Sequence, residues 1–103
     1  MKVSFRIRSE YFNAIRDGTK WFEIRKWSDF WIPRYLKVRK SLEHNCRVQA
    51  VFVCGKKVLR KLIVDVEVWD NAELALGRIP SDQGKRDLGD GPVIKFILER
   101  KGD

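Results

Sequence analysis

The chain has 103 residues, a length that suits one domain with a modest core, and we expect a single domain over residues 1–103. Hydrophobic residues make up 44% of it, which excludes an intrinsically disordered chain. No apolar run approaches the roughly 18 residues that a membrane span requires, and the N-terminus lacks the apolar segment of a signal peptide. We therefore expect a cytoplasmic protein with no membrane partner.

The formal charge of +8 is unevenly distributed along the chain. Residues 1–61 hold 16 basic and 5 acidic side chains, whereas residues 62–103 hold 6 basic and 9 acidic ones. A basic N-terminal part favours a polyanionic partner, because Lys and Arg neutralise phosphates and release counterions. The same charge is also compatible with a surface that only keeps the protein soluble. Charge alone leaves both interpretations open.

The first 18 residues predict a strand followed by a helix. Val3, Phe5 and Ile7 alternate with polar residues, which is the two-residue period of a half-buried strand. Ser9 is a candidate N-cap for a helix over residues 10–17. Gly18 then ends the helix.

Residues 19–26 predict a second strand. Its alternation places the side chains on two faces, with Phe22 and Ile24 on one and Trp21, Glu23 and Arg25 on the other. Strict alternation would set Lys20 opposite Glu23, although the preceding turn decides its direction. Residues 27–46 mix aromatic and basic side chains and contain Pro33, so we expect a long connection with at most one short helix or strand.

The second half of the chain begins with a predicted hairpin. Residues 47–54 and 57–69 are rich in β-branched residues and are separated by Gly55-Lys56. In the second strand we expect one apolar face, made of Leu62, Val64, Val66 and Val68.

A short capped helix over residues 71–76, ending at Gly77, follows this hairpin. Residues 78–92 are rich in Gly and Pro and predict a mobile loop. Residues 93–100 predict a closing strand whose inward side chains are Ile94, Phe96 and Leu98. The predicted fold is therefore α+β, a small curled sheet or mixed β-barrel of about five strands with one or two short helices.

The helix-turn-strand segment from Tyr11 to Lys26 carries a recognisable motif. Its Gly18, Lys20, Glu23 and Arg25 resemble the Gly-x-Lys-x-x-x-x-Arg signature of the ASCH domain family, a branch of the PUA-like superfamily. The hairpin and the closing strand also resemble that family, whereas residues 27–46 and the Gly-rich loop depart from it. The resemblance implies a PUA-like barrel with a cleft beside the motif helix, and a role in binding RNA or nucleotides.

The motif and the basic, aromatic segment around it supply the candidate contacts. Lys20 can serve as a phosphate point charge, or as a base if burial lowers its pKa, but it can also be a solvated turn lysine. Glu23 and Arg25 share a strand face, where they can frame a ligand or form a structural ion pair. The full nucleic-acid-binding set is Lys20, Trp21, Glu23, Arg25, Lys26, Trp27, Trp31 and Arg34.

Proteins bind single-stranded nucleic acid by stacking its bases on aromatic rings that lie among cations. Most tryptophans in a small domain, however, belong to its core. We therefore expect one or two of four rings to be exposed, and the rest to be buried: Trp21, Trp27, Trp31 and Tyr35. Trp69 is expected to pack in the core. RNA or a nucleotide is the expected partner, with single-stranded DNA as a further option, while the oligomeric state stays open.

Two other functions stay open. Some proteins similar to the ASCH family hydrolyse acylated cytidine or RNA, and a hydrolase here would use Lys20 with a strand carboxylate such as Glu67. Against this, the amidohydrolase-like members have a Thr at the position of Glu23. The alternative is a protein-interaction module that docks a partner through residues 27–35.

No cofactor or metal is expected. His44, Cys46 and Cys54 offer three of the four ligands that structural zinc requires, so we interpret the cysteines as core or half-buried thiols.

Overall fold

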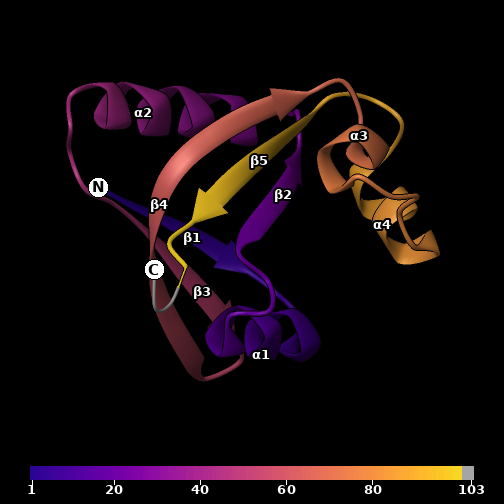
Figure 1. Ribbon diagram of the computed structural model, residues 1–103, viewed down its shortest axis with the longest axis horizontal. Helices are drawn as coiled ribbons and strands as arrows, with labels where there is room; N and C mark the ends of the chain where they lie inside the picture. Colours follow the sequence, from indigo (N-terminus) through magenta and orange to yellow (C-terminus); the bar gives the residue numbers. More distant parts are fainter. Residues whose placement is uncertain (101–103) are drawn as a thin grey trace.

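The computed structural model describes residues 1–100 and shows an α+β fold built on one curled, mixed sheet (Figure 1). The expected domain of residues 1–103 extends three residues further, and those three lie outside the described residues. Within the described range the five strands are β1 (Lys2–Arg6), β2 (Phe22–Lys26), β3 (Val48–Cys54), β4 (Lys57–Trp69) and β5 (Val93–Leu98). The four helices of the same range are α1 (Ser9–Asp17), α2 (Trp31–Glu43), α3 (Ala72–Leu76) and α4 (Asp82–Leu88).

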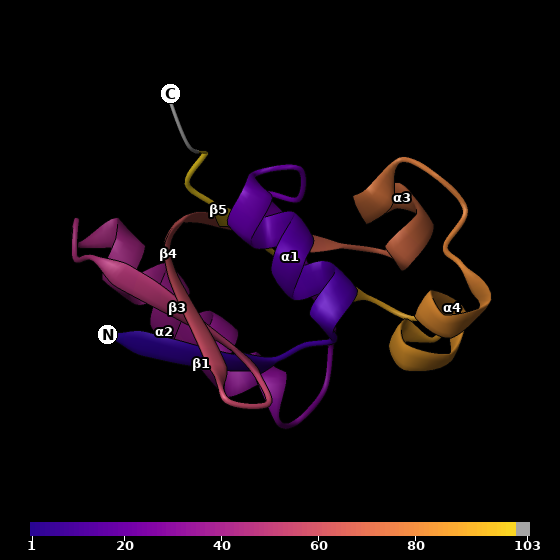
Figure 2. The same cartoon turned by 90° about the horizontal axis from the view of Figure 1, so that it is seen from below.

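The sheet has the strand order β1-β3-β4-β5-β2, and only the β1–β3 pair is parallel. Its curl turns the two edge strands, β1 and β2, toward each other as a half-barrel, with α1 and α2 at opposite ends (Figures 1 and 2). A side chain bridges these edges, because Arg25 Nη2 donates a hydrogen bond to the carbonyl of Arg6 at 3.0 Å. The expected curled, mixed sheet of about five strands is confirmed.

The main hydrophobic core fills the inside of the curl. Val3 and Phe5 of β1 are buried as the alternation predicted, and so are the three inward residues of β5: Ile94, Phe96 and Leu98. Each fully buried apolar side chain of this size contributes roughly 1.5–3 kcal/mol through removal from water. A second, smaller core lies on the other face of the sheet, where Ile24 and Val93 pack against Ala72 and Ala75 of α3.

The connection predicted over residues 27–46 is instead dominated by α2, a helix of 13 residues. Pro33 is compatible with this helix because it lies in the first turn, where backbone N–H groups have no partner within the helix. The carbonyl and hydroxyl oxygens of Ser28 both accept from the backbone N–H of Trp31, which starts the turn. Tyr35 and Val38 are the buried residues of α2 and fix it on the main core.

Two smaller predictions about helices are also corrected. Ser9 does not cap α1 but is its first residue, and the preceding Arg8 makes no capping side-chain hydrogen bond. The loop predicted over residues 78–92 contains α4, which Ser81 caps by accepting from the backbone N–H of Gly84 at 3.2 Å. Figures 1 and 2 show α4 next to α3, beside the sheet. None of the helices in residues 1–100 is long and apolar enough to cross a membrane.

The apolar face predicted for β4 is wrong. Val66 is buried as expected, but Val64 and Val68 are 54% and 45% exposed, and Ile63 is buried in their place. For Ile63 and Val64 the cause is a register shift between Ile63 and Asp65 where β4 pairs with β5, whereas Val68 lies after the shift on the same face as Val66 and is exposed nonetheless. An extra residue in one strand reverses the inward and outward alternation on one side of it.

Candidate functional site

The turn between α1 and β2 sets the direction of Lys20. Gly18 has a φ of 85°, a left-handed conformation that glycine adopts without steric cost, and its N–H donates to the carbonyl of Ile15. The backbone N–H of Lys20 donates a hydrogen bond to the carbonyl of Ala14 at 3.0 Å. Because β2 begins only at Phe22, Lys20 lies outside its alternation and its side chain reaches the side of the sheet that carries Glu23.

Glu23 is the centre of a three-residue charge cluster, which we call the triad. Its side chain is 8% exposed, and it accepts from Lys20 Nζ on Oε1 at 2.9 Å and from Arg25 Nη2 on Oε2 at 2.8 Å. A buried carboxylate is unfavourable unless cations and hydrogen bonds compensate for its lost hydration, and here each oxygen has its own cation. The structure thus contains the ion pair between Glu23 and Arg25 that their shared strand face allowed. The triad as a whole carries one excess positive charge.

Arg25 is held between the triad and two aromatic rings. Its guanidinium carbon lies 5.3 Å from the ring centre of Phe5 and 5.1 Å from that of Trp31. These distances are within the range of favourable cation–π contacts. Its Nε is buried and has no hydrogen-bond acceptor among residues 1–100.

The triad lies in a cleft of about 1140 Å³, formed by α1, β2, α4 and the segment that leads into α2. Among the described residues, two carboxylates line the cleft, Glu23 and Asp87, against six cations: Arg6, Arg8, Lys20, Arg25, Lys26 and Arg78. An excess of cations within one concave surface creates a positive potential, which attracts anions from solution. One ion pair spans the cleft, since Arg8 Nη2 lies 4.0 Å from Asp87 Oδ2 of α4.

Aromatic rings flank the triad on two sides. Tyr11 of α1 is 36% exposed, and Lys20 Nζ lies 4.4 Å from its ring centre. Phe30, just before α2, is 57% exposed and packs edge-on against Trp31. Both rings line the cleft, so the cleft offers flat apolar surfaces as well as cations.

The structure brings together five of the eight candidate nucleic-acid contacts. Lys20, Glu23, Arg25, Lys26 and Trp31 all line the cleft. A sixth, Arg34, lies beside it, with its guanidinium carbon 3.6 Å from the ring centre of Phe30.

Trp21 and Trp27 do not line the cleft. Trp21 contacts Phe22 and the cations Lys95 and Arg100, whereas Trp27 packs edge-on against Tyr35 over the main core. None of the three tryptophans in this segment is fully exposed and only Tyr35 is fully buried, so the expected split into exposed and buried rings is wrong. Trp69 packs on the smaller core, as expected.

Glu67, the catalytic candidate for a hydrolase, lies away from the triad. It pairs with Lys95 across β4 and β5, and Lys95 pairs in turn with Ile24 of β2. Neighbours in a sheet point to the same face, so Glu67 lies on the face of Ile24, opposite to that of Glu23. Its carboxylate already accepts from Trp69 Nε1 at 3.0 Å.

Most other cleft residues were not in the predicted set, among them the cations and exposed rings Arg6, Arg8, Tyr11, Phe30 and Arg78. Arg6, on the outward face of β1, and Arg8, between β1 and α1, continue the polar positions of the predicted alternation, which was a usable signal. For Arg78 no signal existed, because only the packing of α3 and α4 beside β2 brings it to the cleft.

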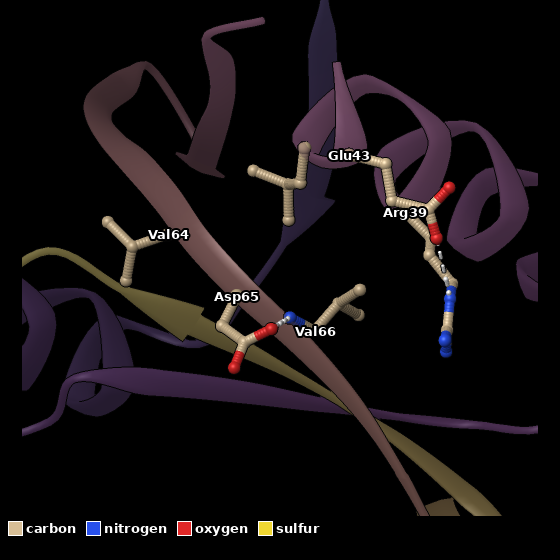
Figure 3. Close-up of a pocket in the computed structure, with 6 residues that line it drawn as sticks. Arg39, Glu43, Val64, Asp65 and Val66 are labelled. Carbon is tan, nitrogen blue, oxygen red and sulfur yellow. Dashed lines mark hydrogen bonds and ion pairs between the residues drawn. The ribbon is translucent and has the colours of Figure 1, made fainter. Parts of the chain in front are cut away.

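A second, smaller groove of about 360 Å³ lies between α2 and β4 (Figure 3). Its charges are satisfied locally, because Glu43 pairs with Arg39 at 3.3 Å and Asp65 accepts from the backbone N–H of Val66 at 2.8 Å. The hydrogen bond of Arg39 with Tyr35, and then that with Glu43, raises the pKa of Arg39 above its ordinary value. This groove therefore offers little free charge to a ligand.

Within residues 1–100 no three His, Cys, Asp or Glu side chains gather as a metal site, and both cysteines are free thiols. No protein-family model, curated protein or solved structure matches this chain. The class of protein must therefore be inferred from the cleft itself.

Proposed function

We propose that this protein is a small RNA- or nucleotide-binding module of the ASCH type, with a PUA-like fold, and that the triad cleft is its binding site. The observation that carries the proposal is a concave surface in which four further cations and exposed aromatic rings surround the partly buried Lys20–Glu23–Arg25 triad. Three of the four motif residues on which the family resemblance rests form this triad, and the fourth, Gly18, lies in the turn that positions Lys20.

The charge of the cleft supports a phosphate-containing ligand. Arg6, Arg8 and Lys26 are exposed, so their side chains can reorient toward phosphates, and each phosphate neutralised releases condensed counterions. Arg25 is more constrained, because its Nη2 already donates to Glu23 and to the carbonyl of Arg6, and its planar guanidinium suits an oxygen acceptor in a fixed position.

The rings support nucleotides over other phosphate esters. Tyr11 and Phe30 expose aromatic surface where cations already lie, the combination with which proteins bind unpaired bases. The carboxylate of Glu23 adds an acceptor for the exocyclic amine of a base. Single-stranded RNA, a modified base in RNA, or single-stranded DNA would all satisfy these groups.

Titration of the protein with a single-stranded RNA octamer tests the proposal, with tryptophan fluorescence as the readout. We expect quenching, because Trp31 lies in the cleft, and an affinity that falls steeply as salt increases. Lys20→Ala should weaken binding, while Lys40→Ala, which removes an exposed cation of α2 outside the cleft, should not. Absence of binding at low salt would refute the proposal. A parallel titration with a DNA octamer of the same sequence shows whether the protein distinguishes ribose from deoxyribose.

The alternative of a small hydrolase rests on the 2.9 Å contact between Lys20 and Glu23, which is short enough for proton transfer. Glu67 is on the other face of the sheet, so Glu23, the strand carboxylate that lines the cleft, would take its place in such an enzyme. Acylated cytidine and labelled RNA incubated with the wild type and with Lys20→Ala test this alternative. Equal background turnover by both proteins would end it.

A further inference from the structure

Phe30 and Arg34 form a flat surface at the edge of the cleft that the triad does not require. Phe30 precedes α2, and its side chain is 57% exposed. The guanidinium of Arg34 lies 3.6 Å from the ring centre, and Arg34 Nη1 donates to the backbone carbonyl of Phe30. The ring is thus held in place by its neighbour.

This surface is joined to the triad by packed rings. Phe30 packs edge-on against Trp31 at 5.2 Å between ring centres, and Trp31 stacks on Phe5 at 5.1 Å with an interplanar angle of 9°. Arg25 of the triad lies against both Trp31 and Phe5. Phe30 therefore contacts Trp31, which itself contacts the triad. A ligand in the cleft can reach both the triad and Phe30 at once.

We propose that Phe30 and Arg34 form a second, base-stacking subsite, and that the ligand of the cleft is consequently a single-stranded oligonucleotide and not a free nucleotide. This inference rests on the proposed function and specifies its ligand. A base laid on the exposed part of Phe30 gains aromatic stacking, and Arg34 beside it can neutralise the adjoining phosphate. The cleft volume of about 1140 Å³ leaves room for more than the single nucleotide that the triad would hold.

The predominance of cations argues for nucleic acid over a protein as the occupant of this surface. An exposed Phe next to an Arg is also a common feature of protein interfaces. Here, however, Lys26, Arg6 and Arg78 line the same cleft, and a neutral or basic protein surface would leave these cations unpaired.

The test compares ligands of increasing length on matched variants. A nucleoside monophosphate and RNA oligomers of two, four and eight nucleotides are titrated against the wild type, Phe30→Ala, Phe30→Trp and Leu36→Ala. Leu36 is the control because it is 56% exposed on α2 and does not line the cleft. Circular dichroism confirms that each variant retains its fold, which we expect because both side chains are exposed.

We expect Phe30→Ala to weaken binding of the longer oligomers about 5- to 100-fold, the range found when a stacking ring is removed, and to leave the monophosphate unchanged. Phe30→Trp should restore the affinity, and Leu36→Ala should have no effect. Oligomer binding that is unchanged in Phe30→Ala would overturn the second subsite while leaving the proposed function intact. If the wild type binds none of the ligands, the proposed function fails instead. An equal loss in Phe30→Ala and Leu36→Ala would also overturn the subsite, because it would indicate a general surface effect.

Discussion

Glu23 and Arg25 lie two residues apart on β2 and form an ion pair of 2.8 Å inside the curl of the sheet. The same Arg25 Nη2 also donates to the carbonyl of Arg6 on β1, so one guanidinium connects the buried carboxylate to the opposite edge strand. The triad therefore has a structural role as well as a role in the cleft. The two roles make separate predictions.

The structural role predicts a large effect of Glu23→Gln on stability. The substitution removes the negative charge and leaves Lys20 and Arg25, 19% and 24% exposed, without a counter-ion. Breaking a fully buried ion pair costs 3–5 kcal/mol, and the partial exposure of these cations lowers our expectation to about 2 kcal/mol. Urea denaturation measures the change in the free energy of unfolding. The matched control is Glu43→Gln, which breaks an exposed pair with Arg39 and should change that free energy by less than about 0.5 kcal/mol.

The electrostatic role predicts a defined salt dependence of RNA binding. Arg8→Ala and Lys26→Ala each remove one exposed cation of the cleft. Each should lower the slope of log affinity against log salt concentration by about one. Lys40→Ala, outside the cleft, should leave the slope unchanged. Titrations at four salt concentrations give the slopes, and slopes equal to that of the wild type in both cleft variants would contradict phosphate contact by these residues.

Asp87→Asn should tighten the binding of RNA. Asp87 is one of the two described carboxylates in the cleft and lies 4.0 Å from Arg8, so its removal raises the local positive potential and frees Arg8. Both side chains are more than half exposed, so we expect a modest gain of about two- to fivefold at low salt, which added salt suppresses. Asp70→Asn is the control, since Asp70 is exposed outside the cleft. The same affinity in both variants would show that α4 does not border the binding site.

The register shift in β4 predicts opposite outcomes for two neighbouring residues. Ile63 is 2% exposed, so Ile63→Ala should lower the free energy of unfolding by about 3 kcal/mol. Val64 is 54% exposed, so Val64→Ala should lower it by less than about 1 kcal/mol. Urea denaturation of the two variants measures both values. A larger loss in Val64→Ala would mean that β4 keeps the simple alternation.

The strands whose alternation is uninterrupted could be predicted from the sequence. Val3 and Phe5, and likewise Ile94, Phe96 and Leu98, alternate without a break, and their burial follows that period. The burial of Ile63 could not be predicted, because the irregularity at Ile63–Asp65 arises from how β4 pairs with β5. The conformational preferences of these residues do not indicate an extra residue in the strand.

The length of helix α2 could not be predicted for a related reason, and residues 27–46 were expected to hold only a short helix or strand. Only Tyr35 and Val38 of its 13 residues are buried, so its apolar stripe is narrow and its exposed side chains, Leu36 among them, obscure the period. The presence of Pro33 also argued against a helix, since the sequence does not reveal that this proline lies in a first turn.

The candidate site could be predicted only in its centre. Gly18, Lys20, Glu23 and Arg25 are close in sequence, so the motif located the triad before its geometry was known. The outer parts come from distant segments, since the curl of the sheet brings Arg6 to Arg25 and α4 brings Asp87 to Arg8. Such proximity depends on the tertiary structure. The same limit applies to Trp21 and Trp27, whose position in a basic segment placed them in the predicted site although they pack elsewhere.

The most direct test of the binding cleft is to map the RNA contact by NMR. Backbone amide shifts are followed while a single-stranded octamer is added to the isotope-labelled protein at low salt. The binding cleft predicts that the largest changes fall on Arg8, Lys20, Arg25, Lys26 and Phe30, and that the hairpin between β3 and β4 stays unchanged. Shifts concentrated instead around Trp21, Trp69 and Lys95 on the opposite face of the sheet, or no shifts at all, would contradict it.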